Sequence, residues 1–484
     1  MSGRVILEIL FIGQVIVAFL TALQVLTDRR ARAATATSWI LLIAVLPVIG
    51  CCLYWLAGKP WLQQRRRDLI ERQRERLGKR MDTGRALRAK GVRAALDDMP
   101  VGTRGLAALA CAVSGLPPVG GNDVEYLADA DDLFARIAGD IDGALDHVHV
   151  LFYIVVADRS SRPVLDAMIR AARRGVRVRF LVDSIGGRGF LRSNDAAALR
   201  EAGVHLVEAL PAGLLRALFQ RIDLRNHRKV VIIDGKIGYV GSHNLAASDF
   251  KVGRANVEWV DATARIEGPA ANELQRVFVE DWWVETEEPV EHLVRPPSGG
   301  DSGAVVQVMA TGPTVEEQSM SQVMATCLHL AQREIILTTP YFVPDEPTMI
   351  SIITAARRGV RVTLVIPEHN DSYLVKLASQ SYFERLLEAG VRLLEFSGGM
   401  LHSKTITVDD ALGVMTSANL DRRSFEINFE VSLLLYDADA TQAMRAMQES
   451  YIERSTRIDP IAWSGRSWWR RLVANAVGLA SPVL

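Results

Sequence analysis

The chain has 484 residues, which is too long for one ordinary hydrophobic core, so two or three domains are expected. Its 56 basic and 56 acidic side chains give a formal net charge of zero, which excludes a bulk electrostatic attraction to nucleic acid. The four cysteines show neither disulfide-framework spacing nor a zinc-binding CxxC pair, so we expect them to be reduced and buried.

Two apolar stretches open the chain. The first, residues 5–26, carries one charge and is long enough to cross a hydrocarbon core of about 30 Å as a helix. The second, residues 38–58, has aromatic residues near its ends and contains Pro47, which a membrane helix tolerates. A cleaved signal peptide or a buried soluble hairpin would be the alternatives, but arginines rather than an AxA-like site follow the first stretch. The sequence predicts a two-helix transmembrane hairpin over residues 1–58.

Basic residues predict the orientation of this hairpin. The loop between the two stretches has three arginines, whereas residues 59–79 contain eight lysines and arginines. The more basic side of a membrane protein is usually cytoplasmic, so everything after residue 58 is expected on the cytoplasmic face. Residues 59–120 are predicted to be a basic juxtamembrane linker or helical region. Within it, residues 59 to about 90 are expected to form either a solvated helix near anionic headgroups or a plain linker.

An eight-residue repeat then indicates a duplication. The sequence AARRGVRV occurs at residues 171–178 and again at residues 355–362. Each copy joins an amphipathic helix pattern to a buried strand pattern, and Gly175 and Gly359 fall where a helix end needs a left-handed residue. Strands that alternate with helices predict parallel βαβ units in each half.

A second composition shift separates the two halves. Residues 287–305 concentrate proline, glycine and serine, as interdomain linkers do. We therefore expect one α/β domain over residues 121–290 and a second over residues 291–484.

The same polar pattern follows in both halves. HxKxxxxD and then SxN occur twice, with 17 positions from His to Asn in each copy; the matched residues are His227, Lys229, Asp234, Ser242 and Asn244, and His402, Lys404, Asp409, Ser417 and Asn419. Side chains alternate on a strand, so His and Lys lie on one face. Lys, Ser and Asn can stabilise phosphate oxygens while His acts as nucleophile or general acid. A metal is not expected, because the ammonium group would repel it.

These motifs resemble the phospholipase D superfamily, and within it the bacterial cardiolipin synthases, as do the phrases PYFVPDEPTM and NLDRRSFEINFEV. The resemblance covers nearly the whole chain. It implies a duplicated phospholipase D type α/β/α sandwich, with two lobes related by a pseudo-twofold axis, preceded by the transmembrane hairpin. Asp410 and Thr416 depart from the family pattern, in which glycine is usual at both positions.

The resemblance also implies a role for each residue of the motifs. The two histidines become the nucleophile and the general acid/base, and which is which stays open. Both lysines bind phosphate, both aspartates support the motifs, and the serines and asparagines contact substrate. A downstream acidic residue usually orients a histidine, and the candidates are Glu258 and Glu430.

The implied activity is cardiolipin synthesis. A phosphatidyl group would move from one phosphatidylglycerol to another in an anionic bilayer of the bacterial inner membrane, through a phosphohistidine and without a cofactor or metal. Nucleic acid is not an expected partner, and no oligomeric state is predicted. A phospholipase D type hydrolase and a catalytically silent membrane scaffold are the alternatives, and phosphatidylethanolamine is an alternative acceptor. Residues 214–225 and 466–484 are amphipathic, as interfacial segments are, although core packing also produces such patterns.

Overall fold

The structure is a computed structural model. It describes residues 3–27, 33–55, 64–82, 96–97, 99–100, 102–211, 223–250, 257–295, 302–315 and 318–479. The chain forms two compact units, of which one contains residues 1–68 and 212–224 and the other contains residues 69–211 and 225–484. Most of the amphipathic stretch predicted at 214–225 lies outside the described residues.

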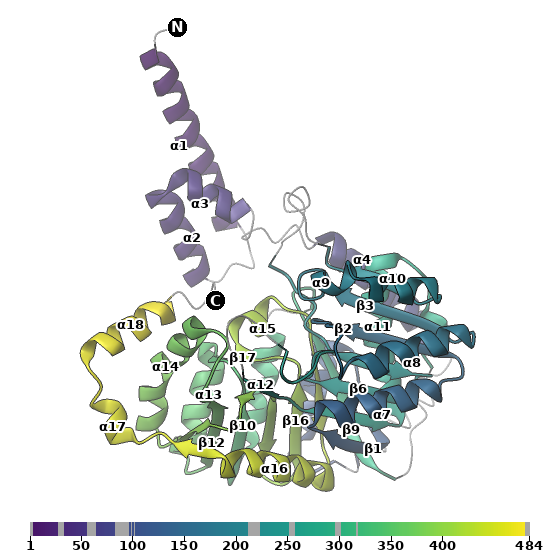
Figure 1. The fold of residues 1–484 in the computed structure, drawn as a ribbon. Helices are drawn as coiled ribbons and strands as arrows, with labels where there is room; N and C mark the ends of the chain where they lie inside the picture. The colour runs from purple at the N-terminus through teal and green to yellow at the C-terminus, as the bar shows by residue number, and fades with distance from the viewer. Residues whose placement is uncertain are drawn as a thin grey trace. The chain divides into compact units, whose positions relative to one another are not determined.

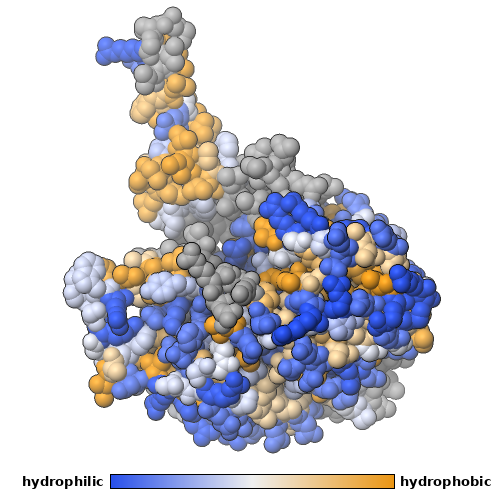
Figure 2. All heavy atoms as spheres, in the orientation of Figure 1, coloured by the Kyte–Doolittle hydropathy of each residue, from blue (hydrophilic) through white to orange (hydrophobic). Residues whose placement is uncertain are grey.

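The N-terminal unit contains α1 (Gly3–Thr27), α2 (Ala33–Val45) and α3 (Pro47–Leu53). Within the described residues, Glu8–Thr27 is the one helical stretch long and apolar enough to cross a membrane, and Figure 2 shows apolar residues over much of its surface. The second predicted span is wrong as a single helix, because the helix stops at Val45 and restarts at Pro47. Proline disfavours helical backbone in the preceding residue, and Leu46 has φ −130° and ψ 72°.

One large sheet forms the centre of the other unit (Figure 1). From one edge to the other the strands run β4-β3-β2-β5-β6-β8-β1-β9-β18-β16-β15-β10-β12-β13-β19. The first half supplies β1 (Val119–Leu127), β2 (His147–Phe152), β3 (Arg177–Asp183), β4 (His205–Ala209), β5 (Val230–Ile233), β6 (Ile237–Gly241) and β8 (Thr263–Glu267). The second supplies β9 (Ala304–Thr311), β10 (Glu334–Thr338), β12 (Arg361–Pro367), β13 (Arg392–Phe396), β15 (Thr405–Val408), β16 (Leu412–Thr416), β18 (Glu430–Leu435) and β19 (Ser455–Arg457).

The strands of the second half repeat the order of those of the first half in the reverse direction across the sheet. A pseudo-twofold axis therefore passes between the antiparallel neighbours β1 and β9. β2, β3 and β4 pair in parallel, and so do β10, β12 and β13. The remaining ladders of this sheet are antiparallel, which the sequence patterns did not indicate. The predicted duplication of an α/β domain is confirmed.

Helices cover both faces of the sheet. Apolar side chains of one face pack with α11 (Pro269–Thr286) and α16 (Ala438–Glu453). Those of the other face pack with α6 (Arg104–Ser114), α7 (Ala130–Asp142), α8 (Arg162–Arg173), α10 (Asn194–Glu201), α12 (Ser319–Leu330), α13 (Glu346–Arg357) and α14 (Tyr373–Glu388). The shorter helices are α9 (Arg188–Leu191), η4 (Glu291–Leu293), α15 (Arg422–Glu426) and α17 (Pro460–Ser464), and the last helix is α18 (Trp468–Leu479).

The repeated octapeptide has the predicted structure in both copies. Each ends a helix, α8 or α13, and begins a strand, β3 or β12. Between them Gly175 has φ +90° and Gly359 has φ +89°, a backbone conformation that glycine adopts without steric cost. The octapeptide therefore belongs to the scaffold of each half.

The stretch predicted as a basic juxtamembrane region is more ordered than a linker. On α4 (Gln64–Asp82), Ile70, Gln73 and Leu77 are buried, and Arg74 donates to Glu280 of α11 at 3.3 Å. A helix is therefore present in this region, but one face of it packs on the protein instead of being solvated. Further along, α6 contributes to the core of the second half.

Candidate active site

The two HxK motifs occupy equivalent places in the two halves. His227 and Lys229 directly precede β5, and His402 and Lys404 directly precede β15. In both copies the lysine is buried and its Nζ donates to the carbonyl oxygen of the histidine two residues earlier, at 2.6 Å and 2.7 Å. Each ammonium group keeps further N–H donors for a ligand.

Each histidine is oriented by a carboxylate from the other half. Nδ1 of His227 lies 3.0 Å from Oε1 of Glu430, and Nδ1 of His402 lies 2.6 Å from Oδ1 of Asp261. Two short parallel β pairings between the halves hold these histidine–carboxylate contacts in place. Asn226 forms a β-bridge with Phe429, and β14 (Met400–Leu401) pairs with β7 (Trp259–Val260). A carboxylate at Nδ1 fixes the tautomer that leaves Nε2 available for chemistry.

Of the two predicted acidic residues, Glu430 orients a histidine and Glu258 does not. The side chain of Glu258 is exposed, and its backbone carbonyl accepts from the N–H of Met400 at 2.8 Å. Asp261, which the sequence reasoning missed, takes the expected place: it lies between β7 and β8, two residues before β8 begins, and Glu430 is the first residue of the equivalent strand β18. Its position before a buried strand was the available signal.

The motif aspartates support the turns that precede the strands. Asp234 has φ +53° and accepts from the N–H groups of residues 145, 146 and 147 at 2.8–2.9 Å. Asp409 has φ +50° and accepts from residues 332, 333 and 334 at 2.8–2.9 Å. Asp410, the departure from the family pattern, leaves this arrangement intact. Both aspartates therefore act on the backbone, away from the histidines.

The serines and asparagines of SxN separate into two groups. Both serines are buried and bond to protein: Ala262 N–H donates to Ser242 at 3.0 Å, and Ser417 Oγ donates to Glu430 at 2.5 Å. The substrate contact of the serines stays a prediction; in this arrangement their hydroxyls bond to the strands and to the carboxylate that orient the histidines. Asn244 and Asn419, in contrast, line the cavity between the two histidines.

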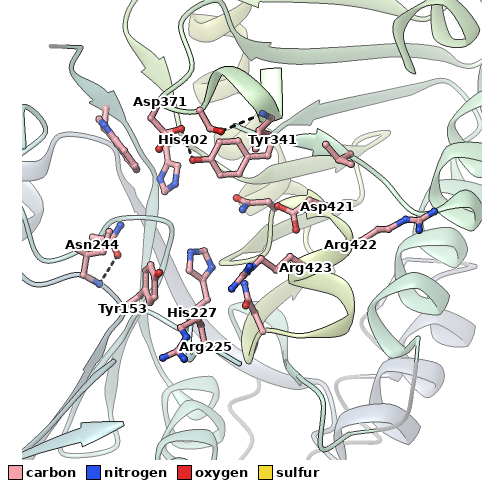
Figure 3. A pocket seen from close by; sticks show the side chains of 17 residues that line it. Tyr153, Arg225, His227, Asn244, Tyr341, Asp371, His402, Asp421, Arg422 and Arg423 are labelled. Atoms are coloured by element: carbon pink, nitrogen blue, oxygen red, sulfur yellow. Dashed lines mark hydrogen bonds between the residues drawn. The ribbon is translucent and has the colours of Figure 1, made fainter. Parts of the chain in front are cut away.

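A cavity of about 290 Å³ lies between the halves, and both histidines line it. Figure 3 shows the two imidazoles facing each other across this space. Aromatic rings flank them: the ring of Tyr153 is 5.1 Å from that of His227, and the ring of Trp259 is 4.3 Å from that of His402. The sequence reasoning missed several other lining residues, namely Arg225, Tyr341, Asp371, Asp421, Arg422, Arg423 and Asn428.

Burial shifts the ionisation of the central groups. It lowers the pKa of His402 to about 3, although the neighbouring Asp261 opposes this shift, and it also lowers the pKa of His227. Burial lowers the pKa of Lys229 to about 7 and that of Lys404 to about 8. The unliganded site therefore holds neutral imidazoles and weakened cations, and a bound phosphate anion would favour the charged forms of all four groups.

Known proteins that resemble this chain identify its family. A family model described as "Cardiolipin synthase, PLD-like domain" matches residues 137–282 and 324–452, more than half of the chain. The chain belongs to this family. A second model, "Phospholipase_D-nuclease N-terminal", matches residues 15–59.

Individual relatives agree with this membership, and a solved structure shares the fold. Cardiolipin synthase A of Erwinia tasmaniensis is 38% identical over 96% of this chain and 95% of its own length. Cardiolipin synthase A of Edwardsiella ictaluri is 36% identical with the same coverage. The crystal structure of phosphatidylserine synthase from Haemophilus influenzae Rd KW20 aligns with a TM-score of 0.58 at 16% identity, covering 80% of this chain and all of that one. This last similarity concerns the fold alone.

Proposed function

We propose that the chain is a phosphatidyltransferase that joins two phosphatidylglycerol molecules into cardiolipin and releases glycerol. The observation that carries this proposal is the crossed pair of histidines, each held by a carboxylate of the other half and both facing one cavity. Membership of the cardiolipin synthase family supports the choice of substrate.

The reaction proceeds in two displacements at phosphorus. In the first, Nε2 of one histidine attacks the phosphorus of phosphatidylglycerol while the other histidine protonates the departing glycerol oxygen. In the second, that other histidine removes a proton from a hydroxyl of a second phosphatidylglycerol, which attacks and releases the first histidine. An imidazole can serve as acid and then as base because its protonation is reversible near neutral pH.

The remaining motif residues stabilise charge or hold the geometry. Lys229 and Lys404 neutralise the non-bridging phosphate oxygens, on which negative charge grows as the pentacoordinate state forms. Asn244 accepts the N–H of Ile154 through Oδ1 at 3.2 Å, which directs its amide N–H groups to a ligand. No bound cofactor is needed for this exchange of phosphodiester bonds.

The membrane supplies both lipids. In this proposal α1 crosses the inner membrane, residues 38–55 return through it as a kinked second span, and the catalytic unit lies on the cytoplasmic side, as the basic residues after residue 58 predict. The C-terminal α18 lies at the bilayer surface, with Trp468, Trp469, Leu472 and Val473 exposed beside two arginines.

The test is a product analysis. The purified full-length protein in detergent micelles receives phosphatidylglycerol, and lipids and glycerol are quantified over time. The proposal predicts cardiolipin and glycerol in equal amounts. Phosphatidic acid without cardiolipin would indicate a hydrolase, and no product would indicate a silent scaffold; either result would overturn the proposal. The double variant His227→Ala/His402→Ala is the negative control.

A further inference from the structure

Acidic side chains line the active-site cavity from the second half of the chain. Of the lining residues that the structure describes, Asp371 and Asp421 are the carboxylates, and both are half-buried. In the view of Figure 3, Tyr341 lies between them. Because a carboxylate repels a phosphate anion, these two residues suit a part of the substrate other than its phosphate.

The first half of the chain does not repeat these groups. Equivalent positions in the two halves follow from two matching parallel pairings, Val155 with Leu245 and Phe342 with Leu420. By this match Ile154 corresponds to Tyr341, and Ala246 corresponds to Asp421. Polar groups on one side of a site whose histidines are arranged symmetrically indicate that the two sides receive different parts of the substrate.

Asp371 is held in a defined orientation by its own loop. The hydroxyl of Tyr341 donates to Oδ1 of Asp371 at 2.7 Å (Figure 3). Asn370 donates through Nδ2 to the carbonyl oxygen of Pro340 at 2.9 Å and accepts the N–H of Ser372 at 3.0 Å. Among the described residues none donates to Oδ2 of Asp371, so this oxygen is available to a ligand in the cavity.

Asp421 is held by the turn that begins α15. Its Oδ1 accepts the N–H of Ser424 at 2.7 Å. Burial raises the pKa of its carboxyl group, although the contacts with Ser424 and Asn419 oppose this rise. A carboxylate offers about four acceptor positions, so Asp421 can still accept a hydrogen bond from a ligand.

The charges around the cavity favour a neutral ligand group beside these carboxylates. Arg422 and Arg423 also line the cavity, and a third guanidinium, that of Arg225, pairs with the buried Asp183 at 3.5 Å. An ammonium ligand would share the cavity with these cations and with the two motif lysines, and a phosphate would lie against the carboxylates. A hydroxyl meets neither repulsion, and it donates to a carboxylate in a short, charge-assisted hydrogen bond.

The transfer reaction places the same alcohol fragment at phosphorus twice. The glycerol that leaves the donor lipid and the headgroup glycerol that attacks both have a free hydroxyl on the carbon next to the reacting oxygen. In a reaction through a covalent intermediate, the leaving oxygen and the attacking oxygen take the same side of phosphorus. One subsite can therefore hold the neighbouring hydroxyl in both steps and orient the reacting oxygen.

We infer that Asp371 and Asp421 form a subsite for the free hydroxyl next to the reacting oxygen of a glycerol headgroup, and that Tyr341 positions Asp371 for this contact. This inference rests on the proposed function and specifies the alcohol as a vicinal diol, in a lipid headgroup or in free glycerol. In the first step the histidine–phosphorus bond forms, the bond from phosphorus to the glycerol oxygen breaks, and that oxygen takes a proton. The second step reverses these changes with the new alcohol. The neighbouring hydroxyl keeps its proton throughout and donates it to a carboxylate.

The test is a competition between two alcohols for one phosphatidyl-enzyme. The full-length protein in phosphatidylglycerol micelles receives propylene glycol, a vicinal diol, and propanol at equal concentration, and the two phosphatidyl alcohols are quantified. Both products arise from the same intermediate, so their ratio depends on the attacking alcohol alone. The wild type is expected to favour the diol, because a site built to bind a hydroxyl discriminates against an alcohol that lacks it.

Substitution of either carboxylate should weaken this preference. Asp371→Asn and Asp421→Asn are each expected to lower the ratio of diol product to propanol product by about five-fold, because a charge-assisted hydrogen bond becomes a neutral one. Asparagine also caps a helix, so Asp421→Asn preserves the start of α15. Tyr341→Phe should lower the ratio by a smaller factor, since Asp371 keeps its charge and loses the donor that orients it. Cardiolipin should fall relative to the propanol product in the same variants.

Asp142→Asn is the matched control and should leave the ratio unchanged, because Asp142 pairs with Arg170 on the surface, at 2.7 Å. A wild type without preference for the diol would overturn the subsite, and so would an unchanged ratio in both carboxylate variants. If Asp421→Asn does not fold, the ratio in Asp371→Asn decides.

Two further measurements separate the possible ligands. Ethanolamine in place of propylene glycol tests an ammonium group, and a preference for ethanolamine that Asp371→Asn and Asp421→Asn abolish would overturn the assignment to a hydroxyl. A constant ratio of cardiolipin to propanol product in these variants would overturn the assignment to the lipid headgroup. Failure of the proposed function would be visible in the wild type itself, as phosphatidyl alcohols without cardiolipin.

Discussion

The carboxylate of Asp261 accepts a hydrogen bond from Nδ1 of His402 at 2.6 Å, although the two residues belong to different halves of the chain. Glu430 and His227 make the reverse contact. Each half therefore supplies a histidine and the group that orients the opposite histidine. Neither half contains a complete catalytic pair of its own, so the duplication produces one active site.

Replacement of Asp261 tests this crossed arrangement. Asp261→Asn keeps the size of the side chain but removes the charge that fixes the His402 tautomer and stabilises its cationic form. We expect kcat to fall by roughly 10²–10⁴-fold with little change in KM, by analogy with the loss of an orienting carboxylate in other histidine sites. Steady-state kinetics of cardiolipin formation measure this effect.

Glu258→Gln is the matched control. It changes a carboxylate three residues away whose side chain is exposed, so kcat should stay within about two-fold of the wild type. An equal loss in both variants would assign the effect to the β7 segment and not to the carboxylate of Asp261.

The pH dependence should distinguish the free enzyme from the complex. Lysines with pKa values of about 7 and 8 lose their protons as pH rises, so kcat/KM should fall on the alkaline side with midpoints in that range. A bound phosphate anion raises both pKa values, so the alkaline fall of kcat should lie at higher pH. Because His402 stays neutral down to a pH of about 3, it should produce no acid limb near pH 6.5. Coincident alkaline limbs for kcat and kcat/KM would contradict this account.

Much of the fold was predictable because duplication repeats local patterns. The helix, glycine and strand of AARRGVRV, and the positions of His227 and His402, follow from periodicity and spacing. The partner of His402 was not predictable in this way. Asp261 lies 17 residues after the motif asparagine of its half, whereas Glu430 lies 11 residues after that of the other half. Their unequal spacing hid the equivalence, and the pairing of β7 with β14 joins segments of different halves.

The break at Pro47 shows a second limit of sequence patterns. Hydropathy describes residues 38–58 as one apolar stretch, but it contains no information on where the backbone bends. The missing N–H of proline and the non-helical conformation of Leu46 set that position.

Asp409→Ala tests the supporting role of the motif aspartates. It removes the acceptor of three backbone N–H groups and leaves a residue at φ +50°, which alanine disfavours. We expect a loss of roughly 2–4 kcal/mol in the free energy of unfolding. Asp409→Asn should lose less, because asparagine tolerates this backbone conformation and retains an acceptor oxygen. Denaturant unfolding measures the free energy of unfolding of the wild type and of both variants. A larger loss of stability in Asp409→Asn than in Asp409→Ala would contradict the proposed role.

The C-terminal helix offers a test of membrane contact. Trp468 and Trp469 are 63% and 58% exposed, and their rings stack at 4.1 Å. In vesicles containing brominated lipids, which quench tryptophan fluorescence on contact, the variant Trp468→Ser/Trp469→Ser should show less quenching than the wild type. Trp463→Phe is the control, because Trp463 packs on Phe383 at 5.1 Å and should not face lipid. Unchanged quenching in the double variant would place α18 away from the bilayer.

The central claim is that one active site, built from both halves, forms a covalent phosphatidyl-histidine. Its most direct test uses a phosphatidyl donor whose nitrophenolate leaving group needs no protonation, followed by rapid quenching and peptide mapping. Of the variants His227→Ala and His402→Ala, one keeps the nucleophile, and in it the phosphatidyl group should accumulate on the remaining histidine, because the histidine that activates the second alcohol is absent. In the other variant no labelled peptide should appear. Label on neither histidine in both variants and the wild type would contradict the account.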